Sequence, residues 1–263
     1  MKKSVIKLTL LLLLTTFISC GVDLLNKVIG NQNVISLERA ITNDFTKVKV
    51  SNGIDLFVEQ GNDISLTVVT DENLQDIIIT EVEEGQLRIY TKKNIWKAAS
   101  KKVYLTVNAL EALSASSGSS VVFENRLKAT DLELSTSSGA SLKIGVDTRS
   151  LMAKSSSGSS SKIEVNASSV TTKSSSGASL RISGETITHE TSASSGGSIR
   201  GNGLVSKKVI AKASSGASVS VYASESIDGK SSSGGGIRCE GDPKQVIKST
   251  SSGGRVSFKQ SKK

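Results

Sequence analysis

The phrase Ser-Ser-Gly recurs eight times between residues 116 and 253, and the regularity of its spacing leaves few architectures open. Successive copies are separated by 21, 19, 19, 19, 20, 18 and 19 residues. Their glycines are Gly118, Gly139, Gly158, Gly177, Gly196, Gly216, Gly234 and Gly253. A flexible Ser/Gly linker has no reason to keep a fixed period, whereas self-similarity at a period of this length is typical of repeat proteins. We therefore interpret residues 113–260 as a series of structural repeats.

Alignment of the repeats on their glycines reveals columns of apolar residues at odd offsets and polar residues at even offsets. The third residue after each glycine is Val121, Leu142, Ser161, Leu180, Ile199, Val219, Ile237 or Val256. The fifth is Phe123, Ile144, Ile163, Ile182, Gly201, Val221, Cys239 or Phe258. The seventh before each glycine is Glu111, Leu132, Leu151, Val170, His189, Val209, Ile227 or Val246. This alternation with period two indicates strands with one buried face.

A repeat of about nineteen residues cannot bury its apolar face alone, so the repeats are expected to stack. Stacked strands lie about 4.8 Å apart, and each column then places like residues over one another. The stretch before the repeats, residues 41–112, also alternates in short segments separated by Gly, Asn and Asp, which predicts further strands. The sequence predicts an all-β fold, a β-helix (β-solenoid), as a single domain over residues 41–260.

The Ser-Ser-Gly phrase is expected to mark a corner of each turn, because glycine allows positive φ and close approach of neighbouring chain. The residue after each glycine is never larger than serine, which predicts that the solenoid is narrow there. The serine directly before each glycine is expected to face inward or to line the bend. Its hydroxyl would then bond to a serine one turn away, because a buried hydroxyl needs a partner.

The N-terminus has the pattern of an exported protein. Lys2, Lys3 and Lys7 precede or flank a short apolar run over residues 8–18, which is shorter than the roughly 20 residues that span a bilayer. Residues 17–20 read Phe-Ile-Ser-Cys, which resembles a bacterial lipobox. We predict a signal peptide over residues 1–19 and lipidation of Cys20, with residues 20–40 as a tether. The alternative is an ordinary signal peptide with an incidental cysteine.

Charge and cysteine usage exclude several classes of function. The formal net charge of +9 falls to +6 without the three lysines of the signal peptide, which is modest for a nucleic-acid-binding protein. With Cys20 acylated, Cys239 has no partner for an intramolecular disulfide, and we expect it to act as a small apolar side chain.

Groups that could perform catalysis are scattered. Asp147 and Glu185 share an offset but lie two repeats apart, so no pair of carboxylates is placed for acid–base chemistry. The corners contain no Asp, which excludes the calcium-binding type of β-roll. His189 is expected to be half-buried, with Ile187 facing inward in its place. Trp96, with Tyr90 and Tyr104, could form a platform for a sugar, although such rings more often cap a core. We therefore predict neither enzymatic activity nor a metal or other cofactor.

A basic column at an outward offset is the candidate binding surface. The fourth residue after the glycine is basic in five repeats: Lys143, Lys162, Arg181, Arg200 and Arg238. A second column, four residues before the glycine, holds Lys154, Lys173, Lys212 and Lys230. The simpler interpretation is a solvated face whose charges prevent aggregation. The functional interpretation is a linear site for anionic polysaccharide or lipopolysaccharide phosphates. Glu164 and Glu240, two residues beyond Lys162 and Arg238, are expected to neutralise part of the column.

The stretch from Val28 to Asn62, the segment Glu83-Glu-Gly-Gln-Leu-Arg-Ile-Tyr-Thr91 and the Ser-Ser-Gly rhythm resemble the auto-transporter adhesin, head GIN domain family. Here the phrase reads Asn52-Gly53-Ile54-Asp55, so Asp55 stands in place of the family's asparagine. The resemblance covers roughly residues 40–258. It implies a right-handed parallel β-helix on secreted or lipid-anchored bacterial proteins, often from the Bacteroidetes, and it brings no catalytic residues.

Two functions remain after these exclusions. The first is an adhesin-like binding module held at the cell envelope by its lipid anchor, with the periplasmic side of the outer membrane favoured and surface exposure as the alternative. The second is a structural or spacer lipoprotein without a specific ligand. A polysaccharide-active enzyme is a distant third. Nucleic acid is not expected as a partner, and the sequence does not indicate an oligomeric state.

Overall fold

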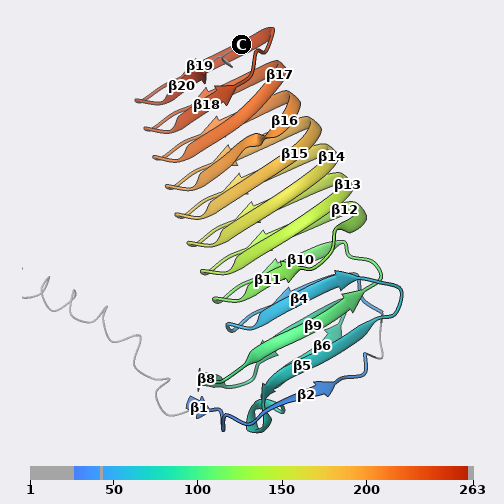
Figure 1. Cartoon of the computed structure of the whole chain (residues 1–263). Coiled ribbons are helices and arrows are strands. Elements are labelled where there is room, and N and C mark those ends of the chain that lie inside the picture. The colour runs from blue at the N-terminus through green and yellow to red at the C-terminus, as the bar shows by residue number, and fades with distance from the viewer. Residues whose placement is uncertain (1–26, 42–43, 260–263) are drawn as a thin grey trace, which may run out of the picture.

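Stacked strands form nearly the whole molecule in the computed structural model, which describes residues 27–41 and 44–259 (Figure 1). The strands are β1 (Lys27–Ile29), β2 (Val34–Glu38), β3 (Lys47–Val50), β4 (Asp55–Gln60), β5 (Ser65–Asp71), β6 (Ile78–Glu83), β7 (Gln86–Thr91), β8 (Asn94–Lys97), β9 (Lys101–Val107), β10 (Ala112–Ala115), β11 (Ser120–Phe123), β12 (Leu127–Thr136), β13 (Ser141–Ser155), β14 (Ser160–Ser174), β15 (Ser179–Ala193), β16 (Ser198–Ala213), β17 (Ser218–Ser231), β18 (Gly236–Glu240), β19 (Gln245–Thr250) and β20 (Arg255–Lys259). Within these ranges the one helix is a single 3-10 turn, η3 (Glu72–Leu74), and no helix there is long and apolar enough to cross a membrane.

Each turn of the solenoid contributes to two faces. One, the β2–β20 face, contains in spatial order β2, β5, β9, β4, β11, the first halves of β13 to β17, then β18 and β20. The other, the β6–β19 face, contains β6, β7, β3, β10, β12, the second halves of β13 to β17, and β19. The pairing is parallel from β9 and β7 onward, so the predicted parallel β-helix is confirmed.

The repeats stack residue over residue. Ser160 pairs with Ser179, and Ser179 pairs with Ser198, so each Gly-aligned column of the sequence is a column of the structure. The apolar columns at offsets +3, +5 and −7 are buried along the middle of the stack, as the alternation predicted. Val246 and Phe258, in the last turn, are exposed members of these columns, because no further described turn covers them.

The Ser-Ser-Gly corners are tight β-turns. In each, the serine before the glycine has φ between 46° and 52°, and the glycine has φ between 70° and 76°. In one corner, the Ala178 N–H donates to the Ser175 carbonyl at 3.0 Å and closes the turn around Ser176 and Gly177. Two successive left-handed residues are the geometry of a type I′ turn, which matches the twist of strands. The serine before each glycine lies in the bend, as one of the two predicted placements has it, and it is exposed, so the other placement, facing inward, was wrong.

The narrow corner that the small residues predicted is present. The residue after each glycine is buried from Ser119 to Gly235. A Cβ on Gly197 would lie 2.6 Å from the Ser174 carbonyl oxygen, and a Cβ on Gly235 would lie 2.6 Å from the Ala213 carbonyl oxygen. Because backbone of the preceding turn passes this close, larger side chains are excluded here.

Buried hydroxyls cluster beside one corner. The Thr136 hydroxyl lies 3.0 Å from that of Ser155, 3.1 Å from that of Ser159 and 2.9 Å from that of Ser161. The Ser159 hydroxyl also donates to the Thr136 carbonyl at 3.0 Å. The partners thus lie one turn apart as expected, although the serines involved are at offsets −3, +1 and +3 rather than −1. This network satisfies the one polar residue in the +3 column, Ser161.

The N-terminal strands stack out of chain order. β3 and β4 lie between the turn formed by β7 and β9 and the turn formed by β10 and β11. Asn52 and Gly53 have φ of 65° and 67°, and the Gly53 N–H donates to the Ser117 carbonyl at 2.9 Å. They therefore form one more corner in the same row. The antiparallel strands β2, β5 and β6 then end the stack at the base.

Part of the predicted tether belongs to the fold. β1 pairs with β8, and β2 pairs with β5 in antiparallel fashion at the base of the β2–β20 face. In β2 only Ile35 is partly buried, so an edge strand of this kind lacks the apolar alternation by which strands are recognised. The signal peptide (1–19) and Cys20 lie outside the described residues.

Candidate functional site

The basic column is a continuous line on the β2–β20 face. Register pairs join Lys143 to Lys162, Lys162 to Arg181, and Arg181 to Arg200, so four cations occupy successive turns. Ser220 follows in the next turn, and Arg238 pairs with it in the turn after. Because neighbouring strands lie about 4.8 Å apart, the backbone places one cation on nearly every turn of this part of the solenoid.

All five side chains of the basic column are exposed, and none forms an ion pair within the described part of the chain. The acids expected to neutralise the column contact other residues instead. Glu164 pairs with Arg126 at 2.9 Å, and Glu240 lies 4.0 Å from Lys259. Neither Glu164 nor Glu240 therefore forms an ion pair with the column. The positive charge of the column remains available to a ligand.

The same column continues into aromatic residues toward the base. Lys143 pairs with Val122, Val122 with Phe57, and Phe57 with Tyr104. The Phe57 and Tyr104 rings stack with centroids 5.1 Å apart and an interplanar angle of 17°, and Tyr104 is 44% exposed. Such a surface offers an apolar platform next to a row of cations. Sequence analysis missed this extension because β4 and β9 stack out of chain order, and only the register reveals it.

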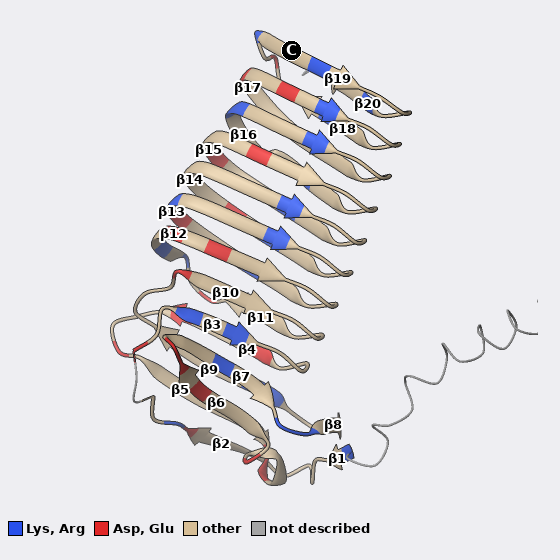
Figure 2. Ribbon diagram, turned by 180° about the vertical axis from the view of Figure 1, so that it is seen from behind, with Lys and Arg blue, Asp and Glu red and all other residues tan. Residues whose placement is uncertain are grey.

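The second basic column is partly neutralised. On the β6–β19 face, Lys154 pairs with Glu133 at 2.7 Å and Lys230 pairs with Asp228 at 3.2 Å. Figure 2 shows acidic and basic segments mixed along this face from β12 to β17. Among the described ion pairs none involves Lys173 or Lys212, so this column is neutralised at two of its four lysines, whereas the basic column of the β2–β20 face is neutralised at none.

The acidic residues at the bend opposite the corners form a structural ion network. The Arg126 guanidinium donates to Asp147 at 2.8 Å and to Glu164 at 2.9 Å, and Asn166 donates to Asp147 at 2.9 Å. The hydrogen bond from Arg126, and then that from Asn166, hold the pKa of Asp147 below its usual value. The described residues contain no cluster of three or more metal-binding side chains. The arrangement suits an ionised carboxylate that fixes the bend.

His189 lies inside the solenoid. It is 1% exposed, and its Nε2 lies 3.0 Å from the Thr172 hydroxyl, while Nδ1 has no partner in the described structure. Burial lowers the pKa of His189 to about 4, so the imidazole is neutral at pH 7. Ile187 is exposed. The expected shift that would bring Ile187 inward was therefore wrong, because the −7 column keeps its register through His189 and pairs it with Val170 and Val209.

The other candidate groups are dispersed. Cys239 is buried, and burial raises the pKa of its thiol to about 11, which makes it unreactive at neutral pH. Tyr90 lies beside Arg88 in β7, on the β6–β19 face, whereas Tyr104 lies on the β2–β20 face. Trp96 lies on β8. The three rings therefore do not form one sugar platform.

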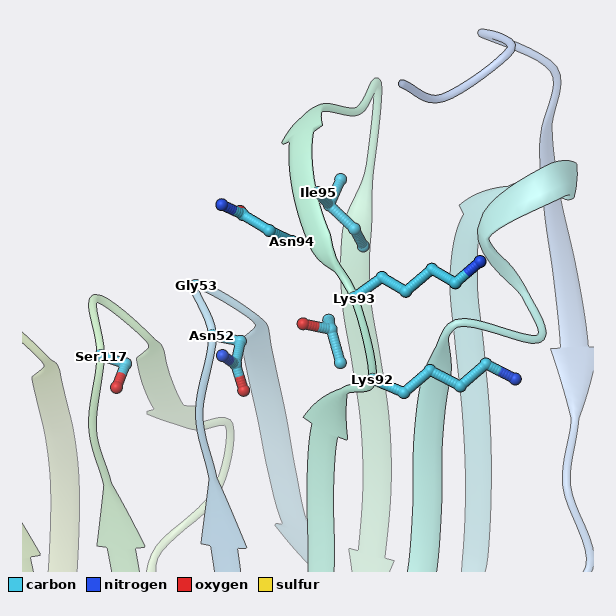
Figure 3. A pocket seen from close by; sticks show the side chains of 8 residues that line it. Asn52, Gly53, Lys92, Lys93, Asn94, Ile95 and Ser117 are labelled. Atoms are coloured by element: carbon cyan, nitrogen blue, oxygen red, sulfur yellow. The ribbon is translucent and has the colours of Figure 1, made fainter. Parts of the chain in front are cut away.

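A hollow of about 760 Å³ lies where the row of corners ends (Figure 3). It is lined by Asn52, Gly53, Thr91, Lys92, Lys93, Asn94, Ile95 and Ser117. In Figure 3 the Lys92 and Lys93 side chains extend away from Asn52 and Ser117, so the polar groups do not gather around one point. Lys101 Nζ donates to the Asn52 carbonyl at 3.2 Å, and burial lowers its pKa.

Residues 44–243 match the family model described as "Putative auto-transporter adhesin, head GIN domain". The chain belongs to this family. Asp55, the departure from the family's Gly-Ile-Asn phrase, lies in β4 beside Lys102 of β9. Among curated proteins no match is found. The family description names an adhesin and no enzyme.

Solved structures of low sequence identity share the fold of this head GIN domain protein. A "putative lipid binding protein" from Parabacteroides distasonis has a TM-score of 0.83 and 21% identity, over 89% of this chain and 99% of that one. A "putative adhesin" from Parabacteroides merdae has a TM-score of 0.82 and 18% identity, over 89% and 99%. One from Bacteroides fragilis has a TM-score of 0.66 and 17% identity, over 89% and 100%. Identities this low establish the fold alone.

Proposed function

We propose that this protein is a non-enzymatic, adhesin-like lipoprotein of the cell envelope that binds an anionic polymer along the β2–β20 face. The ligand class is a polysaccharide or lipopolysaccharide with carboxylate or phosphate groups. Cys20 would carry the lipid anchor, and the periplasmic side of the outer membrane would be its location. The family description supports an adhesin-like role.

The observation that carries this proposal is the run of unpaired cations from Lys143 to Arg200 on successive turns. Like charges held about 4.8 Å apart repel, so an unneutralised line of them costs stability. A polymer with repeated anionic groups would relieve that repulsion and contact several turns at once, which strengthens weak single contacts by multivalency. The Phe57–Tyr104 stack at the end of the line adds an apolar surface for a sugar ring.

The second candidate is a spacer whose charged face only keeps a repetitive sheet soluble. Exposed basic side chains on strands do prevent edge and face association. The two candidates differ in one property: a binding site loses affinity when its cations are removed, whereas a solubility device loses only solubility.

A retention experiment separates them. The chain is passed over immobilised polygalacturonate and, separately, over immobilised lipopolysaccharide at low ionic strength. We expect retention that falls steeply with added salt, because salt screens exposed charges. Replacement of Lys143, Arg181 and Arg200 by Gln should abolish retention and leave the melting temperature unchanged or slightly raised.

The matched control replaces three lysines of the opposite face, Lys154, Lys173 and Lys212, by Gln. This variant loses the same amount of charge, and the immobilised polymer should retain it nearly as well as it retains the parent chain. If the first variant binds as well as the parent, or if both variants lose retention equally, the basic column is not a binding site.

The anchor has its own test. Cys20→Ser should block incorporation of a palmitate analogue and leave the chain either uncleaved or released from membranes, because several acyl chains are needed for stable attachment. Label retained in the variant would contradict lipidation at Cys20.

A further inference from the structure

A small two-stranded ribbon lies at the base of the solenoid. β1 pairs in parallel with β8 through Lys27–Asn94 and Val28–Ile95, and it forms a sheet separate from the main stack. Figure 1 shows the ribbon at the lower end of the row of corners, where the chain enters the described structure. Neither the solenoid repeat nor the basic column requires this element.

Large apolar side chains are exposed on the ribbon. Trp96 is 65% exposed and Ile29 is 59% exposed, whereas Ile95 is partly buried against the core. Lys27 Nζ lies 3.7 Å from the centroid of the Trp96 ring. A tryptophan beside lysines is the combination that favours the headgroup region of a bilayer, where the ring body is apolar and its N–H remains hydrated.

The ribbon is held in place by one buried carboxylate. Asp71, at the end of β5, accepts hydrogen bonds from the backbone N–H groups of Gln32 at 2.7 Å, Ala99 at 2.8 Å and Ser100 at 3.3 Å. These donors follow β1 and β8, so Asp71 clamps both strands. Burial alone would raise the pKa of Asp71, but the backbone donors outweigh it, and the net pKa lies below its usual value. The orientation of the ribbon is therefore fixed relative to the solenoid.

The ribbon and the turn before it are basic. Lys27, Lys92, Lys93 and Lys97 are all exposed, and no ion pair involves them within the described ranges. Of the neighbouring acids, Asp71 is buried, and Glu72 accepts hydrogen bonds from Asn31 at 3.4 Å and Asn33 at 3.0 Å. Four exposed lysines thus lie on the ribbon or directly before β8, and one of them, Lys27, contacts the exposed Trp96 ring.

Chain length ties the ribbon to the membrane. Six residues separate Cys20 from Lys27. Even fully extended, seven residue steps span only roughly 25 Å. If Cys20 carries the lipid anchor, the start of β1 cannot lie farther than this from the bilayer surface. The base of the solenoid is then the end that faces the membrane.

We propose that the β1–β8 ribbon, with Lys92 and Lys93, docks on a bilayer surface that contains anionic lipids. Trp96 and Ile29 enter the headgroup region, and the lysines contact anionic headgroups. The inference rests on the lipid anchor proposed above. Docking would fix the angle at which the solenoid leaves the membrane, which attachment through the lipid alone would not do.

Trp96 provides a direct measurement because it is the one tryptophan in the sequence. The lipidated chain is reconstituted into phosphatidylcholine vesicles with or without phosphatidylglycerol, and brominated lipids serve as quenchers. The anchor holds the protein on both kinds of vesicle, so the difference between them reports docking. We expect a shift of Trp96 emission to shorter wavelength and a loss of intensity in the anionic vesicles, both reversed by high salt.

Replacement of Lys92 and Lys93 by Gln should reduce the shift and the quenching, while replacement of Lys154 and Lys173 by Gln should not. Emission that stays the same in neutral and anionic vesicles would overturn the docking proposal even though the chain floats with the vesicles. A chain that does not float with neutral vesicles would overturn the anchor instead. In that case, added anionic vesicles either quench Trp96 of the unanchored chain, which supports docking, or leave it unchanged, which refutes it. Retention of the same variants on the immobilised polymer tests polymer binding by the basic column independently of membrane docking.

Discussion

Gly177 donates its backbone N–H to the carbonyl oxygen of Ser195, the serine at the same corner one turn later, at 3.2 Å. The same bond recurs from Gly139 to Ser157 and from Gly158 to Ser176, each at 3.1 Å. The interstrand hydrogen bonding therefore continues through the corners. Each corner serine must keep its left-handed conformation for its carbonyl to point at the glycine of the turn before.

The left-handed corner serines predict an order among substitutions at Ser176, whose φ is 50°. Ser176→Val should destabilise the protein by about 1–3 kcal/mol, because a β-branched residue is strained at positive φ. Ser176→Asn should be neutral or stabilising, since asparagine tolerates this conformation and occupies the equivalent position at Asn52. Denaturant titration of both variants measures the difference. Equal stability of the two would contradict the type I′ geometry.

Leu180 tests the register of the core. It is 0% exposed in the middle of the stack, with Ser161 and Ile199 on the turns either side. Leu180→Asp should destabilise by several kcal/mol or prevent folding, because it buries an unpaired charge. Lys208→Asp, at an exposed position of the next turn but in a polar column, should change the melting temperature little. Circular dichroism melting measures both variants. If the melting temperature of Leu180→Asp equals that of the parent chain, the register of the core is wrong.

Gly184 should not tolerate a side chain. Its φ is 117°, and a Cβ would lie 1.9 Å from the Val165 carbonyl oxygen. Gly184→Ala therefore requires the backbone to move and should cost roughly 2 kcal/mol or more. Gly145 is the control, because its Cβ would meet only the flexible Arg126 side chain at 3.5 Å. Gly145→Ala should be nearly neutral in the same denaturant titration.

His189 should make stability depend on pH below neutrality. Its pKa in the folded protein is about 4, whereas in the unfolded chain it is about 6.5. Between these values the unfolded state binds more protons, so stability should be constant above about pH 6.5 and fall as pH drops toward 4. The loss amounts to about 3 kcal/mol at most. His189→Leu should remove this component, seen as the difference between parent and variant across that range. An identical pH dependence in both proteins would mean that His189 is accessible to solvent.

The repeat region could be predicted from sequence because each turn has the same local pattern as its neighbours. Leu142, Ile163 and Val219 are buried where their offsets placed them. The inward placement of the serine before each glycine was wrong because alternation was extended through the corner, where two left-handed residues interrupt it. The prediction placed Ile187 inside and His189 at the edge because isoleucine is the more apolar side chain. The strand instead keeps its register, which places His189 inside. The polar interior beside His189, with Thr172 and Thr191 hydroxyls 2.9 Å apart, accommodates the imidazole.

The base of the molecule could not be predicted in the same way. β3 and β4 have partners on one side that come 39 and 47 residues later, and no repeat connects them. β1 and β2 are short and mostly exposed, so they lack an apolar pattern. The Phe57–Tyr104 stack and the β1–β8 ribbon both depend on this region. Lipidation of Cys20 remains a prediction from the sequence.

The out-of-order stacking of β3 and β4 also determines how the molecule can be assembled. A chain that emerges N-terminus first exposes residues 47–60 before their lower partners, β7 and β9, have appeared. The first complete layers can therefore form only after Val107 has emerged, and they join segments distant in sequence. The turn of β10 and β11 still pairs with β3 and β4, 65 residues back. From β12 onward each turn finds its neighbour about twenty residues back, which favours rapid pairing because the loops to be closed are short. We therefore expect the solenoid to grow in one direction, from the base upward, once these layers that join distant segments have formed.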